Sequence, residues 1–253
     1  MHNADFIKQW QTEETAAFQG WDFSHIDGRY DCPAPPWDYK AVVQSYLKDT
    51  DALLDMGTGG GEFLLTIGHP HDKTFATESY VPNYALCKRV LSPLGISVVQ
   101  TYENDDDLSL PFGDVSFDVI INRHNCFDLV EVSRALKPGG YFITQQVGDE
   151  NDREFIERLM GTVYEKSTTH SVEYYADQLK HLGFEILQTE ESLYPVKYFD
   201  VGALVYHAKQ IPWQYPGFSV KTHLDQLLAY QKEIEASGYI QGTGHRFLIV
   251  ARK

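Results

Sequence analysis

The sequence predicts an α/β protein built on a doubly wound, mostly parallel sheet. From residue 51 onward, short apolar segments alternate with helical or turn segments, which is the order expected of βαβ units. The apolar segments are continuous, as in strands that are buried on both faces of a parallel sheet. A glycine-rich loop follows the first apolar segment, where such sheets bind their ligands.

Five strands are predicted in the first part of this pattern. Pro82 lies where a helix would begin, and Gly95 lies where one would end. The Lys-Pro-Gly-Gly segment at 137–140 predicts a turn into the fifth strand. The predicted strands are DALLDMG (51–57), KTFATE (73–78), ISVVQT (96–101), FDVIIN (117–122) and YFITQQV (141–147).

The remainder of the chain continues with mixed elements. We expect a helix over 171–184, a long strand or strand pair over 184–198, a second helix over 223–238 and a final strand over 245–253. Both helices end at a glycine. The aromatic-rich stretch between the long strand and the second helix is predicted to be a long connection, of a kind that often carries function.

Residues 1–50 have a different composition from the rest. Prolines between positions 33 and 36 exclude a helix there. We expect residues 1–50 to form an aromatic cap or lid, and residues 51–253 to form the main domain with an aromatic insertion around 190–222. The aromatic residues of the cap are Trp10, Phe18, Trp21, Phe23, Tyr30, Trp37 and Tyr39.

Length and charge limit the function. A chain of 253 residues allows one large domain with a cap. The net charge of −15 argues against a nucleic-acid partner, which requires a basic face. The chain has no apolar run of about 20 residues, and its start is neither basic nor apolar enough for a signal peptide. Three distant cysteines do not suggest disulfides. We therefore expect a cytoplasmic protein without a membrane partner.

The loop LLDMGTGGGEF (53–63) indicates which cofactor is bound. Its glycines resemble the dinucleotide pattern G-x-G-x-x-G, but the last position is Glu62. The carboxylates of Glu62 and Asp55 would repel a pyrophosphate. S-adenosylmethionine carries a sulfonium and an ammonium and no phosphate, so the same acids would attract it. The glycines would let the backbone come close to the ligand.

Glu78 ends the second predicted strand. It follows the loop at about the distance expected of the acid that holds a ribose. A carboxylate can accept hydrogen bonds from both ribose hydroxyls. The alternative is a solvated acid at a strand end.

The sequence resembles class I S-adenosylmethionine-dependent methyltransferases of the small-molecule, type 11-like kind. The resemblance is carried, in order, by LLDMGTGGGEF, ATES, DDLSLPFGDVSFDVIIN and EVSRALKPGGYFI, over roughly residues 50–147. HLGFEI and HRFLIVARK resemble the last part of the same fold. The resemblance implies a Rossmann-like, seven-stranded sheet with an antiparallel last strand, to which the aromatic segments would add N-terminal and C-terminal caps.

The resemblance also implies a set of cofactor contacts. The loop would surround the methionine end, and the acid after the second strand would hold the ribose. Asp106 would accept from the adenine amino group and the backbone of Asp107 would face the ring. Many family members have a small residue at the position of Asp107. With Asp105 also nearby, the residue that contacts adenine is assigned only to within one position. The implied cofactor-binding residues are Asp55, Gly57, Thr58, Gly59, Gly61, Glu78, Ser79, Asp106, Asp107 and Asn122.

His124 is the candidate catalytic residue. It follows the fourth predicted strand in NRHNCFD, and an imidazole is suited to removing a proton near neutral pH. Alternatively, it packs at a helix start or lines the pocket. The Asn-Pro-Pro-Tyr motif of methyltransferases that modify amino groups of bases or glutamine is replaced here by Asn-Arg-His-Asn. The His-Pro-His-Asp segment at 69–72 lacks a third ligand, so no metal is expected.

We therefore predict an S-adenosylmethionine-dependent methyltransferase that acts on an unidentified small-molecule acceptor. Two alternatives remain: a non-catalytic S-adenosylmethionine-binding protein, and a protein or RNA methyltransferase. A dinucleotide-dependent oxidoreductase is disfavoured, because glycine is absent at position 62 and no Tyr-x-x-x-Lys pair is evident. The sequence leaves the oligomeric state open.

Overall fold

The computed structural model describes residues 3–101 and 108–253. Within these residues, one eight-stranded sheet has the order β1-β7-β8-β6-β5-β2-β3-β4. Strands β6, β5, β2, β3 and β4 run parallel, β8 runs antiparallel to both β6 and β7, and β1 runs antiparallel to β7. The strands are β1 (Tyr30–Asp31), β2 (Leu53–Met56), β3 (Thr74–Glu78), β4 (Ser97–Gln100), β5 (Phe117–Arg123), β6 (Leu136–Val147), β7 (Glu185–Tyr198) and β8 (Ile240–Arg252).

The predicted fold class is confirmed. The seven expected strands form an α/β sheet, and the last strand of the chain is antiparallel. The two-residue β1, which the sequence did not predict, adds an eighth strand at the edge beside β7. The antiparallel β8 lies inside the sheet, between β7 and β6.

Two layers of helices cover the sheet. Helices α2 (Tyr39–Tyr46), α3 (Glu62–Ile67) and α4 (Val81–Val90) pack on one face, through strand residues such as Leu53 and Ile121. Helices α5 (Leu129–Ala135) and α7 (Val172–His181) pack on the other face, through neighbours such as Leu54 and Ile120. Because successive strand side chains point to opposite faces, a strand buried on both faces needs apolar residues at nearly every position. This explains the continuous apolar segments of the sequence.

Four helices of the described residues lie outside these two layers. They are α1 (Asn3–Glu14), α6 (Arg153–Met160), α8 (Val201–Gln210) and α9 (Leu224–Ser237). No helix in the described ranges is long and apolar enough to cross a membrane.

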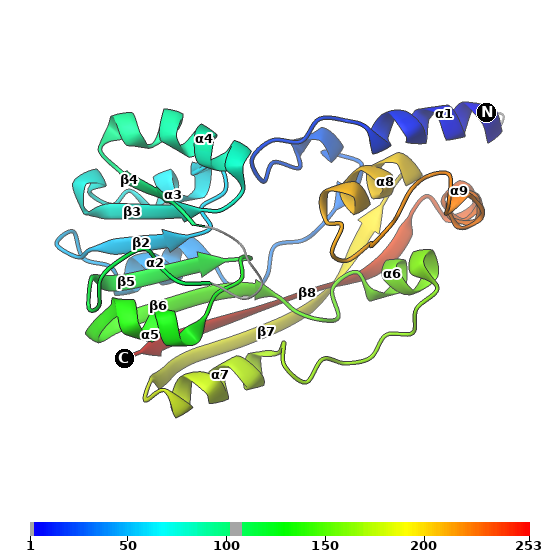
Figure 1. Ribbon diagram of the computed structural model, residues 1–253. Coiled ribbons are helices and arrows are strands. Elements are labelled where there is room, and N and C mark those ends of the chain that lie inside the picture. Colours follow the sequence, from blue (N-terminus) through cyan, green and yellow to red (C-terminus); the bar gives the residue numbers. More distant parts are fainter. Residues whose placement is uncertain (1–2, 102–107) are drawn as a thin grey trace.

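Strands β7 and β8 extend beyond the rest of the sheet. The pairing of β6 with β8 ends at Val147 and Arg246, but β7 and β8 remain paired as far as Tyr198 and Ile240. Figure 1 shows these two strands, yellow and red, reaching a second group of helices formed by α1, α6, α8 and α9. This second lobe has its own apolar core, which includes Trp10 and residues of all four helices.

The stretch predicted to be a long connection contains helix α8, so this prediction was wrong. Seven of its ten residues are buried, and a helix that is apolar all round lacks the amphipathic period used to recognise helices. The Asp200 side chain, which accepts a hydrogen bond from the Ala203 N–H at 2.9 Å, was an available start signal. Helices α1 and α6 were not predicted. The predicted turn at 137–140 lies within β6, with a positive φ of 79° at Gly139.

Helix α1 should contribute strongly to stability through Trp10, which is 1% exposed. We expect Trp10→Ala to lower the free energy of unfolding by about 3–5 kcal/mol, through lost burial and a new cavity. Trp213→Ala is the matched control, because Trp213 is 67% exposed and stacks on Trp21; we expect about 1 kcal/mol there. Urea unfolding measures both. Equal losses of unfolding free energy in Trp10→Ala and Trp213→Ala would show that α1 is not packed as described.

Candidate functional site

The glycine loop between β2 and α3 is the first part of the site. Gly57, Gly59 and Gly61 have positive φ angles of 70°, 65° and 88°. Residues with a Cβ rarely adopt this conformation, so the path of the loop depends on glycine. The N–H groups of Gly57 and Thr58 donate to the Thr77 carbonyl oxygen at 3.1 and 3.0 Å. The loop is thereby attached to β3.

Glu78, the last residue of β3, lies directly beside this loop. It is buried, and its Oε2 accepts a hydrogen bond from the Gly59 N–H at 2.8 Å. Its Oε1 accepts from the N–H groups of Ser79 and Tyr80, each at 3.0 Å. The structure therefore brings together the glycine loop and the acid that the sequence predicts for the ribose.

Two more carboxylates surround the loop. Burial raises the pKa of Asp55 to about 6, although the nearby Arg123 guanidinium lowers it. The Glu62 carboxylate lies over Gly60, where an added Cβ would come within 2.2 Å of Oε1. With Glu78, these acids give the loop a negative environment. Such a site fits a cationic ligand and is unfavourable for a phosphate.

A narrow cleft adjoins the loop on the side of β3 and β4. The predicted adenine contacts, Asp106 and Asp107, lie outside the described residues. The Asn125 side chain lies against Gly57, where a Cβ would come within 2.2 Å of Asn125 Nδ2. The cleft is lined by Met56, Thr77, Ser79, Thr101, Leu108, Ser109, Leu110, Asn125, Cys126 and Phe127.

Asn122, at the end of β5, has a fully buried side chain. Its Oδ1 accepts hydrogen bonds from Gln146 Nε2 at 2.5 Å and from Thr144 Oγ1 at 3.4 Å. Its Nδ2 donates to the Met56 carbonyl oxygen at 3.5 Å. The structure thus shows Asn122 joining β5, β6 and β2, and its contact with a cofactor remains a prediction.

His124 is held by Gln145 and, through it, by Trp37. The Trp37 Nε1–H donates to Gln145 Oε1 at 2.7 Å. Because an indole nitrogen only donates, the amide nitrogen of Gln145 must face His124, 3.0 Å from Nε2. His124 Nε2 therefore accepts, and its proton lies on Nδ1. Burial, with the positive charges of Arg246 and Arg123, places the pKa of His124 well below its usual value.

Tyr39 fixes the N-terminal segment to the same edge of the sheet. Its hydroxyl lies 3.0 Å from the carbonyl oxygens of both Asn122 and Ile143. Its ring packs in the core below α2, which begins at this residue. Part of the segment predicted to be a cap therefore belongs to the wall of the site.

An open groove lies between this segment and β5. It holds about 490 Å³ of space. The Arg123 guanidinium lies 4.0 Å from the centre of the Phe63 ring. The groove is lined by Ala34, Pro35, Pro36, Trp37, Asp38, Tyr39, Lys40, Phe63, Arg123 and Gln145.

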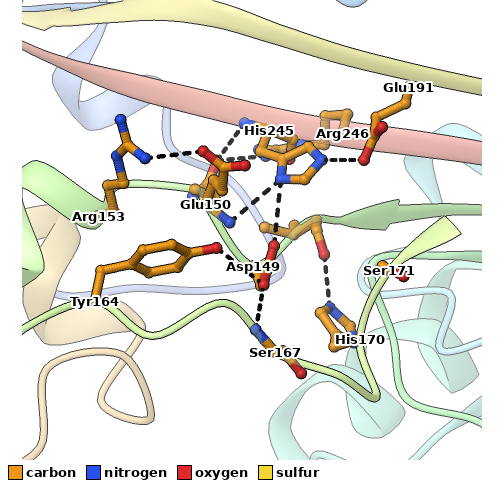
Figure 2. Close-up of polar contacts among 12 residues, drawn as sticks. Asp149, Glu150, Arg153, Tyr164, Ser167, His170, Ser171, Glu191, His245 and Arg246 are labelled. Carbon is orange, nitrogen blue, oxygen red and sulfur yellow. Dashed lines mark hydrogen bonds and ion pairs between the residues drawn. The ribbon is translucent and has the colours of Figure 1, made fainter. Parts of the chain in front are cut away.

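A polar network follows β6 and contacts β8. Figure 2 shows Asp149 between His245 of β8 and the chain leading to α7. Asp149 Oδ2 accepts from the Tyr164 hydroxyl at 3.0 Å and from the Ser167 N–H at 2.6 Å. His245 Nδ1 accepts from the Glu150 N–H at 3.2 Å, and its Nε2 therefore donates to Glu191, 2.9 Å away. The network joins three distant parts of the chain.

Sequence reasoning did not assign a role to Arg123, Gln145 or Asp149, and it placed Trp37 and Tyr39 only among the aromatic residues of the cap. Their only local signal is position: the polar residues follow apolar strand segments, and the aromatic residues precede a helix. Their partners are 83 or more residues away in the case of Tyr39 and Trp37. The two histidines at 69 and 71 contact backbone carbonyls of Asp51 and Leu94. No group of three or more metal-ligating side chains occurs among the described residues.

Comparison with known proteins identifies the central part of the chain. Residues 54–144 match a family model described as a methyltransferase domain. No curated protein matches the sequence. The matched range includes the glycine loop, Glu78 and the segment after β5.

Several solved structures share the fold at low sequence identity. A functionally unknown protein from Deinococcus radiodurans R1 has a TM-score of 0.59 and 14% identity, over 91% of this chain and 96% of its own. A protein of Bacillus halodurans C-125, provisionally named a methyltransferase, has a TM-score of 0.56 and 16% identity, over 85% and 98%. YcgJ of Bacillus subtilis has a TM-score of 0.54 and 17% identity, over 85% and 97%.

The raised pKa of Asp55 predicts a pH-dependent effect of its replacement. At pH 7 Asp55 is ionised in both the folded and unfolded states, so the folded state carries the cost of a buried charge. We expect Asp55→Asn to stabilise the unliganded protein at pH 7 by about 1–2 kcal/mol. The gain should shrink as the pH falls from 6 to 4, where the folded-state carboxyl becomes protonated.

Urea unfolding at several pH values measures this effect. Asp72→Asn is the matched control, because Asp72 is exposed. A variant that is less stable than the wild type at pH 7 would contradict a net cost of the Asp55 charge.

Proposed function

We propose that the chain is a class I, S-adenosylmethionine-dependent methyltransferase, in keeping with the methyltransferase-domain model that its residues 54–144 match, and that it methylates a small-molecule acceptor at the edge where β2, β5 and β6 end. The observation that carries the proposal is the set of carboxylates around the glycine loop. Asp55, Glu62 and Glu78 converge on a loop that is shaped by three positive φ angles. An acidic, glycine-lined loop suits a cofactor that is cationic and has no phosphate.

The proposed cofactor contacts are those that the family resemblance implies, and the acidic, glycine-lined loop supports them. Asp55 and the backbone of Gly57, Thr58, Gly59 and Gly61 would hold the methionine end. S-adenosylmethionine supplies, when bound, a methyl group on a sulfonium whose positive charge the acids favour. An adjacent cation would also relieve the cost of ionising a buried Asp55.

The nucleoside end is proposed to lie in the narrow cleft. Glu78 is the candidate for the ribose hydroxyls, and Ser79, which lines the cleft, is beside it. Asp106 and Asp107 remain the candidates for adenine. Asn125, whose side chain lies against Gly57, is an added candidate for contact with bound cofactor.

We propose that His124 positions the acceptor rather than removing a proton from it. Its Nε2 already accepts a hydrogen bond from Gln145, and its lowered pKa makes it a weak base. The Nδ1–H would remain available as a donor. Most of the catalysis would then come from alignment of the acceptor and exclusion of water.

Two aromatic segments support a closed site. Trp21 lies over the glycine loop, where a Cβ on Gly59 would be 3.7 Å from Trp21 Cβ. Trp21 also stacks on Trp213, with ring centres 6.0 Å apart. The N-terminal cap therefore connects the second lobe to the loop. This aromatic cap, together with the net charge of −15, favours a small acceptor over an RNA.

The Glu78 assignment can be tested without knowing the acceptor. We expect Glu78→Gln to weaken S-adenosylmethionine binding about tenfold, because hydrogen bonds to a charged group contribute more than those to a neutral one. Isothermal titration calorimetry measures the change. Glu173→Gln on the exposed side of α7 is the control. Equal affinity in the wild type and Glu78→Gln would refute this assignment.

The tautomer and charge of His124 can be read by ¹⁵N NMR. We expect a neutral ring with its proton on Nδ1, and constant ring shifts from pH 6 to 8, because its pKa lies well below the usual value. His124→Gln assigns the signals, and Gln145→Ala should disturb the tautomer. Once an acceptor screen yields a substrate, His124→Ala should slow turnover with little effect on cofactor affinity. A His124 signal that titrates near pH 7 would instead favour a base.

A further inference from the structure

Arg123 is the residue whose chemistry the proposed methyl transfer leaves unused. It ends β5, next to Asn122, and is exposed in the groove. Its side chain makes no hydrogen bond or salt bridge with any residue in the described ranges. By contrast, Arg29 pairs with Glu13 and Asp200, and Arg134 pairs with Asp114 and Glu131.

The guanidinium of Arg123 is nevertheless held in place. It stacks on the Phe63 ring, with 4.0 Å between Cζ and the ring centre. A cation–π contact of this kind uses none of the N–H donors of the guanidinium, and no hydrogen bond from Arg123 to another described residue uses them. The Arg123 side chain is therefore already partly ordered without a ligand, which lowers the entropy cost of binding one.

Lys40 adds a second positive charge to the groove. It too makes no ion pair with the residues that the structure describes. The acid beside it, Asp38, accepts a hydrogen bond from the Ala41 N–H at 3.1 Å, as the N-cap of α2. In a chain of net charge −15, two cations on one groove that form no salt bridge with the described residues indicate an anionic ligand.

The surroundings indicate which anion. A planar guanidinium edge matches the two oxygens of a carboxylate or a phosphate. Asp55 lies close enough to Arg123 for the charges to influence each other, and its negative charge penalises a dianion more than a monoanion. Most of the remaining lining is apolar or aromatic, from the prolines at 35 and 36, Trp37 and Phe63. A carboxylate on a flat apolar body fits these features best.

We propose that this groove is the acceptor subsite and that the acceptor is a small carboxylic acid with an apolar, ring-sized body. Its carboxylate pairs with Arg123, assisted by Lys40, and its body lies along Trp37 and Phe63. The volume of about 490 Å³ is in the range of small-molecule sites. Gln145, which lines the groove and contacts His124, joins the subsite to the proposed positioning residue. This inference rests on the proposed methyltransferase function.

The carboxylate at the methionine end of the cofactor is a second group that the Arg123 guanidinium would bind. Two probes separate the two carboxylates. Benzoate carries the acceptor-like carboxylate, and benzamide is its neutral counterpart. S-adenosylmethionine carries the amino-acid carboxylate, whereas 5′-methylthioadenosine has the same nucleoside without it.

The experiment compares the wild type, Arg123→Gln and the control Arg89→Gln, which alters an exposed arginine of α4. Calorimetry measures benzoate and benzamide with and without saturating S-adenosylhomocysteine, and measures both cofactor probes. We expect Arg123→Gln to weaken benzoate about tenfold, which is the size of one charge-assisted hydrogen bond. Benzamide, S-adenosylmethionine and 5′-methylthioadenosine should change less than twofold, and Arg89→Gln should change nothing.

Three results would overturn the proposal. The first is a wild type that binds benzoate no better than benzamide. The second is unchanged benzoate binding in Arg123→Gln. The third is a tenfold loss for S-adenosylmethionine with none for 5′-methylthioadenosine, which would assign Arg123 to the cofactor. A wild type that does not bind S-adenosylmethionine would refute the proposed function separately, because benzoate is also titrated without cofactor or its analogue.

Discussion

The continued pairing of β7 with β8 beyond the end of β6 is the constraint on which the rest of the structure depends. It gives the second lobe a rigid attachment to the sheet and places its helices beside the carboxyl ends of the parallel strands. It also leaves one side of β8 without a strand partner. The chain after β6 covers that side: Glu154 Oε2 accepts from the Thr243 N–H at 2.9 Å, and Asn151 Oδ1 accepts from the His245 N–H at 3.1 Å. Covering an edge in this way satisfies its backbone groups and prevents further pairing.

The same arrangement separates the charges of the site. The acids lie at the glycine loop, where β2 and β3 end, whereas Arg123 and Lys40, which form no salt bridge with the described residues, line the groove beside α2. Asp55 and Arg123 stand between these regions and affect each other. A cationic cofactor and an anionic acceptor would each meet complementary charge at adjacent positions. Such a division would favour correct orientation of both ligands, which is the main requirement of an in-line methyl transfer.

The predictable part of the fold came from local patterns. The five apolar strands, the helices ended by Gly183 and Gly238 and the glycine loop all follow from residues within a few positions of one another. Helix α8 escaped prediction because its burial in the second lobe removes the polar face by which helices are recognised. The two-residue β1 could not be predicted, since only its pairing with Lys197 and Tyr198 of β7, far along the chain, makes it a strand.

By itself, the sequence determined the fold class, the acidic glycine loop and the pairing of that loop with Glu78, because parallel strands must end at a common edge. It could not determine which way Asn122 faces, which proton His124 carries or what Arg123 contacts. Those properties depend on Gln146, on Gln145 with Trp37, and on Phe63. Each partner comes from another element, so only the packing of strands and helices in three dimensions decided them.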